Sequence, residues 1–189
     1  MTLYIRNMVC NRCKASVQGI FEAAGIHPQS ISLGEVVVAD DAIAPALLQQ
    51  IAGKLSQTGF ELIDDRKGRM IERIKNVIVD LVHYTDDRPR EKYSEILSRE
   101  LHYDYSYLSK LFSEVEGITI EQYIIAQKTE KVKEYLVYDE LSLGQIAEMM
   151  GYSSVAHLSA QFKKVTGMSP SEFKKLGIHH RKPLDEVGK

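Results

Sequence analysis

Residues 141–174 read LSLGQIAEMMGYSSVAHLSAQFKKVTGMSPSEFK, and this stretch decides the fold of the second half of the chain. Ser142 is a residue type that favours a helix N-cap, and Gly151 permits the left-handed backbone of a sharp turn. Apolar residues recur at helical spacing on both sides of that glycine. The pattern predicts a short helix over 142–150 and another over 154–166, which is the layout of a helix-turn-helix unit.

Another copy of this layout lies earlier in the chain. Helical periodicity over 93–101 and over 104–116 predicts two more helices, and an apolar stripe over 120–136 predicts a long helix that connects the two units. Pro170 stands in the first turn of a last predicted helix. Periodicity alone does not separate two such units from an ordinary helical bundle.

Two sets of residues mark this region more specifically. The later unit contains Ile146-Ala147, Gly151-Tyr152, Phe162-Lys163-Lys164, Gly167 and Ser169-Pro170, and the earlier unit contains Tyr107 to Phe112, Gly117 and Gln122-Tyr123. Through them, residues 70–176 resemble the AraC/XylS family of bacterial transcription regulators. In that family the second helix of each unit enters a major groove, and the two grooves lie on one face of the duplex about one turn apart. The resemblance implies a sequence-specific DNA-binding regulator.

The resemblance also assigns DNA contacts to individual residues. By motif position they are Tyr105, Ser106, Ser109 and Lys110 in the earlier unit and Ser154, Val155, Ala156 and Ser159 in the later one, with Lys163 and Lys164 at phosphate. Relatives commonly carry arginine where this chain has Ala160, which cannot make a bidentate contact to guanine. The later unit is therefore expected to read sequence weakly, through thymine methyl groups or DNA shape. The residues assigned to the core instead are Leu108, Leu111, Phe112, Leu158 and Phe162.

The first part of the chain alternates strand and helix patterns. Strands are predicted over 2–6, 30–33, 35–39 and 60–63, and helices over 13–24 and from an N-cap at Asp41 to an end at Gly59. The order β-α-β-β-α-β is the ferredoxin-like plan. The predicted fold class is therefore α+β, with an all-α domain after the ferredoxin-like one. The predicted divisions are a domain at 1–65, a polar linker at 66–69, the double helix-turn-helix domain at 70–176, and a flexible tail at 177–189.

The two cysteines of the chain, Cys10 and Cys13, lie between the first predicted strand and the first predicted helix. A disulfide across so short a loop would close little chain entropy. Two thiolates near a helix amino terminus can instead face one soft ion. They suit linear Cu(I), whereas zinc needs more ligands and no histidine lies nearby in sequence. Cu(I) is the expected ion, with Ag(I), Zn(II), Cd(II) and Hg(II) as alternatives.

The loop Met-Val-Cys-Asn-Arg-Cys at residues 8–13, on this predicted fold, resembles the heavy-metal-associated domain of copper chaperones and metal-pumping ATPases. The resemblance covers residues 2–64 and implies that Met8 packs beneath the loop and is not a ligand. Asn7 replaces the usual glycine, and Phe60 stands where relatives place Tyr or Lys and would shield the site. Two other interpretations stay open: a domain that has kept its fold without its metal, and a redox C-x-x-C pair.

Composition limits the other functions. The chain of 189 residues has a net charge of −2, so DNA affinity must come from a local basic surface and not from the overall field. It carries no apolar run long enough for a membrane helix and no secretory h-region, which favours the cytoplasm. The scattered histidines, His157 among them, are assigned to surface or packing positions. No catalytic triad or phosphate-binding glycine loop stands out, so enzyme activity is not expected.

The expected function is a metal-responsive transcription regulator, in which an ion at Cys10 and Cys13 changes the affinity for DNA. The expected partners are double-stranded DNA, RNA polymerase, a second copy of the chain and a copper chaperone. One alternative is a DNA-binding regulator whose first domain docks a metallochaperone. The others are a metallochaperone whose helical part binds protein, and a thiol oxidoreductase.

Overall fold

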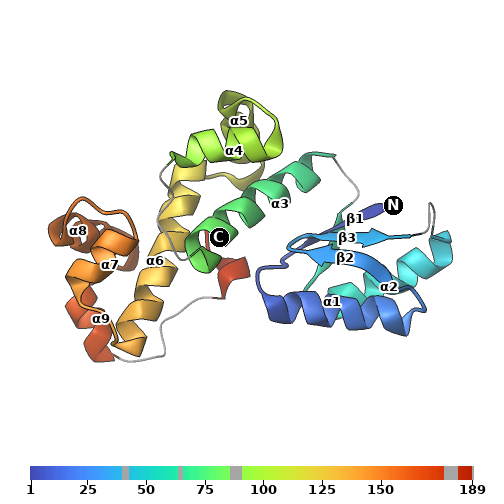
Figure 1. Ribbon diagram of the computed structural model, residues 1–189, viewed down its shortest axis with the longest axis horizontal. Coiled ribbons are helices and arrows are strands. Elements are labelled where there is room, and N and C mark those ends of the chain that lie inside the picture. Colours follow the sequence, from blue (N-terminus) through green and yellow to red (C-terminus); the bar gives the residue numbers. More distant parts are fainter. Residues whose placement is uncertain (40–42, 64–65, 86–90, 177–182, 189) are drawn as a thin grey trace. The chain divides into compact units, whose positions relative to one another are not determined.

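The computed structural model describes residues 1–39, 43–63, 66–85, 91–176 and 183–188 (Figure 1). The chain divides into two compact units, Met1–Asn76 and Val77–Lys189, and each is considered by itself. The predicted N-cap role of Asp41 and the part of the predicted tail at 177–182 lie outside the described residues.

The first unit is built on a four-stranded antiparallel sheet with the strand order β2-β3-β1-β4. Its elements are β1 (Thr2–Arg6), α1 (Asn11–Ala23), β2 (Pro28–Ser32), β3 (Glu35–Val38), α2 (Pro45–Gln57) and β4 (Glu61–Ile63). They follow the predicted order, although α2 begins at Pro45, later than predicted, because a proline is well suited to the first helical position. The turn between β2 and β3 falls at Gly34, whose φ of 80° requires glycine-like backbone freedom.

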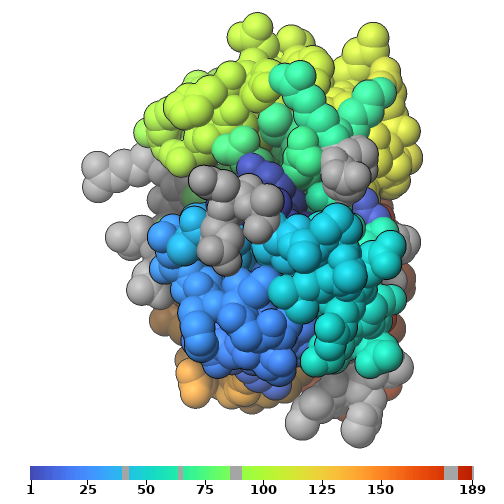
Figure 2. Space-filling view, turned by 90° about the vertical axis from the view of Figure 1, so that its right-hand side faces the viewer, coloured from blue at the N-terminus to red at the C-terminus, as the bar shows by residue number. Residues whose placement is uncertain are grey.

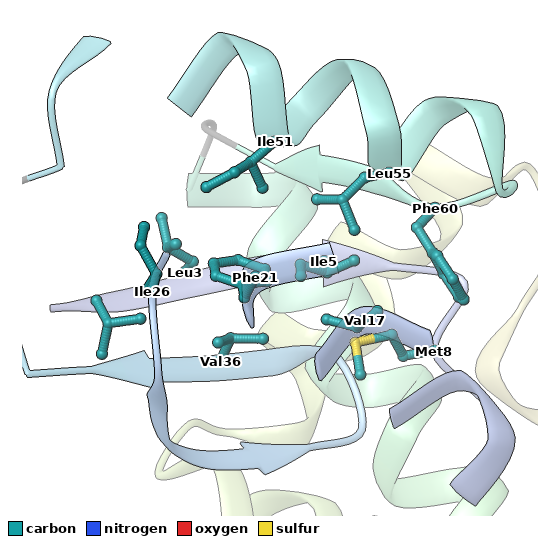
Figure 3. Packing of buried hydrophobic residues seen from close by; sticks show 11 residues of the cluster. Leu3, Ile5, Met8, Val17, Phe21, Ile26, Val36, Ile51, Leu55 and Phe60 are labelled. Atoms are coloured by element: carbon teal, nitrogen blue, oxygen red, sulfur yellow. The ribbon is translucent and has the colours of Figure 1, made fainter. Parts of the chain in front are cut away.

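Helices α1 and α2 cover one face of this sheet (Figure 1) and lie against each other, with α2 in cyan in Figure 2. Side chains alternate along a strand, so Leu3 and Ile5 of β1 both point to that face, where they are buried. They meet Phe21 of α1 and Ile51 of α2 in one apolar core, which Figure 3 shows from close by. This core holds the loop between β1 and α1 in place.

The opposite face of β1 is met by the start of α3 (Arg66–Val79). Tyr4 and Arg6 alternate with the core residues of β1 and point away from them. The Arg69 guanidinium lies 5.4 Å from the centre of the Tyr4 ring, and Arg6 Nε lies 3.4 Å from a carboxylate oxygen of Glu72. Helix α3 therefore belongs to the packing of this unit over its first ten or so residues.

The prediction of a linker at 66–69 is wrong, because these residues form the first turn of α3. The division between the two units falls after Asn76 instead, inside the helix. Ile71 and Ile74 are fully buried, and burial of this apolar stripe outweighs the low helix propensity of the polar, glycine-containing stretch before it.

The second unit is all helical in the part that the structure describes. After α3 come a π-helical turn (Asp80–Tyr84), α4 (Tyr93–Leu101), α5 (Tyr105–Glu116), α6 (Ile120–Tyr138), α7 (Leu143–Met149), α8 (Val155–Thr166), α9 (Pro170–Leu176) and a 3₁₀ turn (Leu184–Glu186). The pairs α4–α5 and α7–α8 are the two predicted units, and α6 is the predicted connecting helix (Figure 1). Within the described ranges, no helix combines the length and the apolar character that crossing a membrane requires.

The ends of these helices are held by local hydrogen bonds. The hydroxyl of Thr119 accepts a hydrogen bond from the backbone N–H of Gln122 at 3.1 Å and caps α6. The hydroxyl of Ser142 caps α7 in the same way, through the N–H of Gln145 at 3.3 Å. Both form capping boxes, which explains why these helices begin where the sequence predicts.

The end of the chain differs from the flexible tail that was predicted, as far as residues 183–188 are concerned. Val187 is buried, and the carbonyl oxygen of Leu184 accepts a hydrogen bond from the side-chain amide of Gln127 at 3.3 Å. Gln127 is itself fully buried in α6, and its amide also donates to the hydroxyl of Tyr123 at 2.9 Å, so the carbonyl of Leu184 is a further acceptor for a buried donor group. The lack of periodicity in the tail could not reveal this contact, because it is made by one apolar side chain and one carbonyl.

Candidate nucleic-acid interface

Helices α5 and α8 are the second helices of the two units, and they carry one buried and one solvent-facing side. Seven of the predicted contact residues are exposed and three are half-exposed: Ser106, Lys110, Ser154, Val155, Ala156, Lys163 and Lys164 in the first group, Tyr105, Ser109 and Ser159 in the second. The five residues assigned to the core, Leu108, Leu111, Phe112, Leu158 and Phe162, are all buried. The core assignment is therefore confirmed, and every predicted contact residue remains accessible to a partner.

The spacing of the accessible residues places them in stripes. Ser109 and Lys110 follow Ser106 by three and four positions, and Ser159 and Lys163 follow Ala156 by three and seven, so each set lies on one side of its helix. Such a stripe is what a helix presents to base edges when it lies in a major groove.

Tyr105, in the first turn of α5, is engaged within the protein. Its hydroxyl donates a hydrogen bond to the carboxylate of Glu121 in the first turn of α6. Burial and this hydrogen bond raise the pKa of Tyr105. The same hydrogen bond is the main reason that the pKa of Glu121 lies below its usual value. A contact of Tyr105 with DNA would therefore be made by its ring, while the hydroxyl ties α5 to α6.

We expect the Tyr105→Phe substitution to raise the pKa of Glu121 towards its usual value, because the donor that favours the carboxylate is removed. The stabilisation from this hydrogen bond is present at neutral pH and is lost as the pH falls through the lowered pKa of Glu121. A nuclear magnetic resonance titration of the Glu121 side chain measures the change. Tyr107→Phe, on the exposed side of the same helix, is the control and should leave the titration unchanged.

Ser154 is used structurally at the start of α8. Its hydroxyl accepts a hydrogen bond from the backbone N–H of His157 at 3.1 Å, as an N-cap. The ring of His157 is exposed, lies 3.1 Å from the Ser153 hydroxyl through Nδ1, and packs edge-on against Tyr152. His157 thus stands in the first turn of α8, in agreement with its assignment to a surface or packing position.

Lys163 and Lys164 lie near the carboxyl end of α8 and are both exposed. Lysines there interact favourably with the helix dipole, so their position has a structural explanation of its own. Ala160 is exposed on the same helix, so its small side chain is not required by packing. The basic charge that α8 offers to a partner is therefore concentrated at Lys163 and Lys164.

A separate feature of the first unit is the pair Cys10 and Cys13. Cys10 is the N-cap residue of α1, Cys13 lies in its first turn, and their Sγ atoms are 3.2 Å apart. Both are half-buried free cysteines. Burial opposes ionisation of Cys10, but hydrogen bonds from Cys13 and the backbone amides of this turn outweigh it and lower its pKa. Burial and the hydrogen bond to Cys10 raise the pKa of Cys13.

The residues around this pair explain how the loop is held. Met8 is fully buried beside Val17 and near Phe60, so its sulfur is part of the core (Figure 3). Asn7 has a φ of 72°, a left-handed backbone that asparagine tolerates better than most residues, and its side-chain amide donates to the carbonyl of Gly59 at 2.8 Å. Asparagine can therefore stand where the resemblance expects glycine. Among the described residues, no group of three or more His, Cys, Asp or Glu side chains is placed to hold one ion.

Comparison with known proteins bears on the second unit. Residues 97–176 match the family described as "Helix-turn-helix domain". The "Probable transcriptional regulator LumQ" of Photobacterium leiognathi is 27% identical over 136 residues, which are 71% of this chain and 53% of that protein. The "Bifunctional transcriptional activator/DNA repair enzyme AdaA" of Bacillus subtilis is 30% identical over 100 residues, which are 52% of this chain and 47% of that protein. This chain thus spans about half the length of these two relatives.

Among solved structures, the C-terminal domain of AraT, a response regulator from Geobacillus stearothermophilus, is 26% identical. The similarity covers 62% of this chain and 94% of that one, with a TM-score of 0.49.

The family match extends from α4 to the end of α9, so it takes in α5, α8 and the connecting helix α6. Residues 97–176 of this chain are therefore similar to a helix-turn-helix domain, and their resemblance to the AraC/XylS family stays a prediction.

Proposed function

We propose that this protein is a sequence-specific DNA-binding transcription regulator. The observation that carries the proposal is the pair of helices α5 and α8, each with a buried apolar side and an opposite, accessible side, inside a matched helix-turn-helix domain. The accessible side of α5 reads bases through Ser106, Ser109 and Lys110. The accessible side of α8 contacts thymine methyl groups through Val155 and Ala156.

The two helices make different kinds of contact with DNA. Lys163 and Lys164 contact phosphate, which fixes the register of α8 on the duplex without reading sequence. Lys110 lies 4.0 Å from Glu114 in an exposed ion pair, an interaction weak enough to be exchanged for a contact with DNA. Ala160 offers no hydrogen bond, so most of the sequence discrimination resides in α5. RNA polymerase and a second copy of the chain are partners that this function would use.

The test is a selection from a randomised duplex pool with the full chain, followed by anisotropy titration of the selected duplex. Specific binding should be at least about a thousandfold tighter than binding to an unrelated duplex. Ser159→Glu adds a negative charge to the accessible side of α8 and should abolish this preference. Ser171→Glu makes the same change on the exposed start of α9 and should leave it intact. A wild-type chain that enriches no sequence would refute the function.

We also propose that the first unit is a ferredoxin-like, heavy-metal-associated domain whose Cys10 and Cys13 bind a soft ion, Cu(I) foremost. The support is the pair of sulfurs 3.2 Å apart at the start of α1, together with the buried position of Met8, which leaves two thiolates as the donor set. Two soft donors suit a monovalent soft ion, which when bound would join the loop to the first turn of α1. The ion favours whichever conformation of the protein binds it more tightly. If that conformation also has a different affinity for DNA, the ion changes DNA binding.

Replacing both cysteines, Cys10→Ser with Cys13→Ser, is expected to lower the bound Cu(I) from one ion per chain to none, because serine hydroxyls are poor ligands for soft ions. Metal analysis after anaerobic purification and titration with Cu(I) measures this. Met8→Leu is the control and should keep its ion, since it preserves apolar volume and Met8 is not a ligand.

The same proteins separate metal control from its rivals in a DNA titration with and without Cu(I). A change in affinity for wild type and Met8→Leu, but not for the serine variant, supports a metal-responsive regulator. Identical curves throughout would remove metal control and favour docking of a copper chaperone, while leaving DNA binding intact.

A further inference from the structure

Lys128 lies in the middle of α6 and contacts both helix-turn-helix units. Its Nζ donates a hydrogen bond to the carbonyl oxygen of Met150 at 2.9 Å. The same atom lies 5.3 Å from the centre of the Tyr93 ring and 5.7 Å from the centre of the Tyr152 ring. Tyr93 is the first residue of α4 in the earlier unit, whereas Met150 and Tyr152 belong to the end of α7 and the turn before α8.

Each of these contacts stabilises the group that Lys128 touches. The carbonyl of Met150 is among the last of α7, which have no partner within their own helix. Both tyrosine rings are half-buried, and a cation near a ring face is attracted more strongly when water is partly excluded. Burial, with a smaller repulsion from Tyr152, raises the pKa of Tyr93 to about 12, and burial raises the pKa of Tyr152 to about 12. Both rings therefore stay neutral at physiological pH.

One intervening contact connects the partners of Lys128 to each of α5 and α8, the helices proposed to contact bases. Tyr152 packs edge-on against His157 in the first turn of α8, with ring centres 5.3 Å apart. On the other side, α4 packs against α5. In the part of the chain that the structure describes, α5 and α8 both pack on α6, and no helix of one unit packs extensively on a helix of the other. The angle between the two helix-turn-helix units is thus set largely by their contacts with α6.

Two helices that enter successive grooves of one duplex must keep a fixed separation and angle, because the grooves are about one turn apart. A side chain that joins both units at once limits that angle, whereas packing of each unit on α6 separately leaves it adjustable. We propose that Lys128 is a positioning residue that holds the two helix-turn-helix units at the angle that simultaneous binding of two grooves requires. The proposal rests on the DNA-binding function proposed above, and Lys128 itself acts through Tyr93 and Tyr152.

The test compares Lys128→Met with Lys131→Met in the full chain. Lys131 forms an ion pair with Glu134, 2.8 Å away, and its Nζ lies 5.0 Å from the centre of the Tyr135 ring, but both partners belong to α6 itself. Each substitution removes a polar contact and a cation–π contact of a lysine in α6, and only the first removes a link between the helix-turn-helix units. Lys128→Arg should restore function, because a guanidinium donates hydrogen bonds and stacks on aromatic rings.

The readout uses the two-groove site selected with wild type and two duplexes derived from it. One keeps only one half-site, and the other has about five base pairs inserted between the halves. Lys128→Met should weaken binding to the two-groove site by about tenfold. It should leave half-site affinity unchanged and should reduce the penalty of the insertion. Lys131→Met and Lys128→Arg should behave as wild type on all three.

Equal weakening on the half-site and the two-groove site would overturn the proposal, since it would show a general loss of structure. Wild-type affinity of Lys128→Met for both sites would overturn it as well. Hydrogen–deuterium exchange of the DNA-free chain distinguishes this failure from failure of the DNA-binding function. Faster exchange at the start of α4 and in the turn before α8 in Lys128→Met alone shows the link between the units, and unchanged exchange there refutes it, whether or not wild type binds DNA.

Discussion

The Phe162→Ala substitution is expected to lower the free energy of unfolding of the second unit by about 3–5 kcal/mol. Phe162 is 2% exposed on the inner side of α8, and its ring meets that of Phe173 in α9 edge-on, with ring centres 5.5 Å apart. Truncation removes this aromatic pair and leaves a cavity that the short helix α9 cannot close. The loss is a large part of the total stability of a domain of this size.

Chemical denaturation followed by circular dichroism measures this loss, and DNA titration of the same sample should show the loss of specific binding. Val165→Ala is the control, because Val165 belongs to the same helix but is 47% exposed. Its expected effect is within about 0.5 kcal/mol. A Phe162→Ala protein as stable as Val165→Ala would contradict the assignment of Phe162 to the core that orients α8.

Replacing both Lys163 and Lys164 with alanine is expected to make the salt dependence of DNA binding shallower. Each contact of a lysine with phosphate releases counterions, so the slope of log K against log salt should decrease in magnitude by about two for the pair. Affinity should fall by a similar factor for the selected duplex and for an unrelated one, because phosphate contacts carry no sequence information. Both lysines are exposed, so the fold should be unaffected.

Anisotropy titrations over a series of salt concentrations measure the slope, and Lys175→Ala is the matched control on α9. That variant should keep the slope of wild type. If the double variant lost discrimination between duplexes while its slope stayed the same, these lysines would be reading bases, and the division of roles along α8 would be incorrect.

The elements of both units could be predicted from sequence because their signals are local. Ser142, Gly151 and the apolar residues around them are enough to place α7, the turn and α8, since capping and helical periodicity act over a few residues. The same holds for β1, whose alternation of apolar and polar residues gives its bounds at Thr2 and Arg6. Which side of α5 and α8 is buried follows from that periodicity as well.

Local signals failed where distant residues compete. A polar stretch with glycine at 66–69 predicts a linker, yet it becomes the first turn of α3 because this helix packs on the open face of β1. Residues 183–188 lack periodicity, yet Val187 is buried and Leu184 provides a partner for Gln127. In both places the free energy comes from contacts between segments far apart in the chain, which no window of sequence contains.

The sequence by itself determined the order of the helices and strands, the two helix-turn-helix units, and the accessible residues of α5 and α8, because these depend on patterns within one helix or one turn. Only the tertiary structure decided which of the polar residues are already engaged. The hydroxyl of Tyr105 is held by Glu121, that of Ser154 caps α8, and Lys128 lies between Tyr93 and Tyr152. The physical reason is that a hydrogen bond or a cation–π contact between two helices depends on where their axes lie in space, and that position is set by the packing of the whole core.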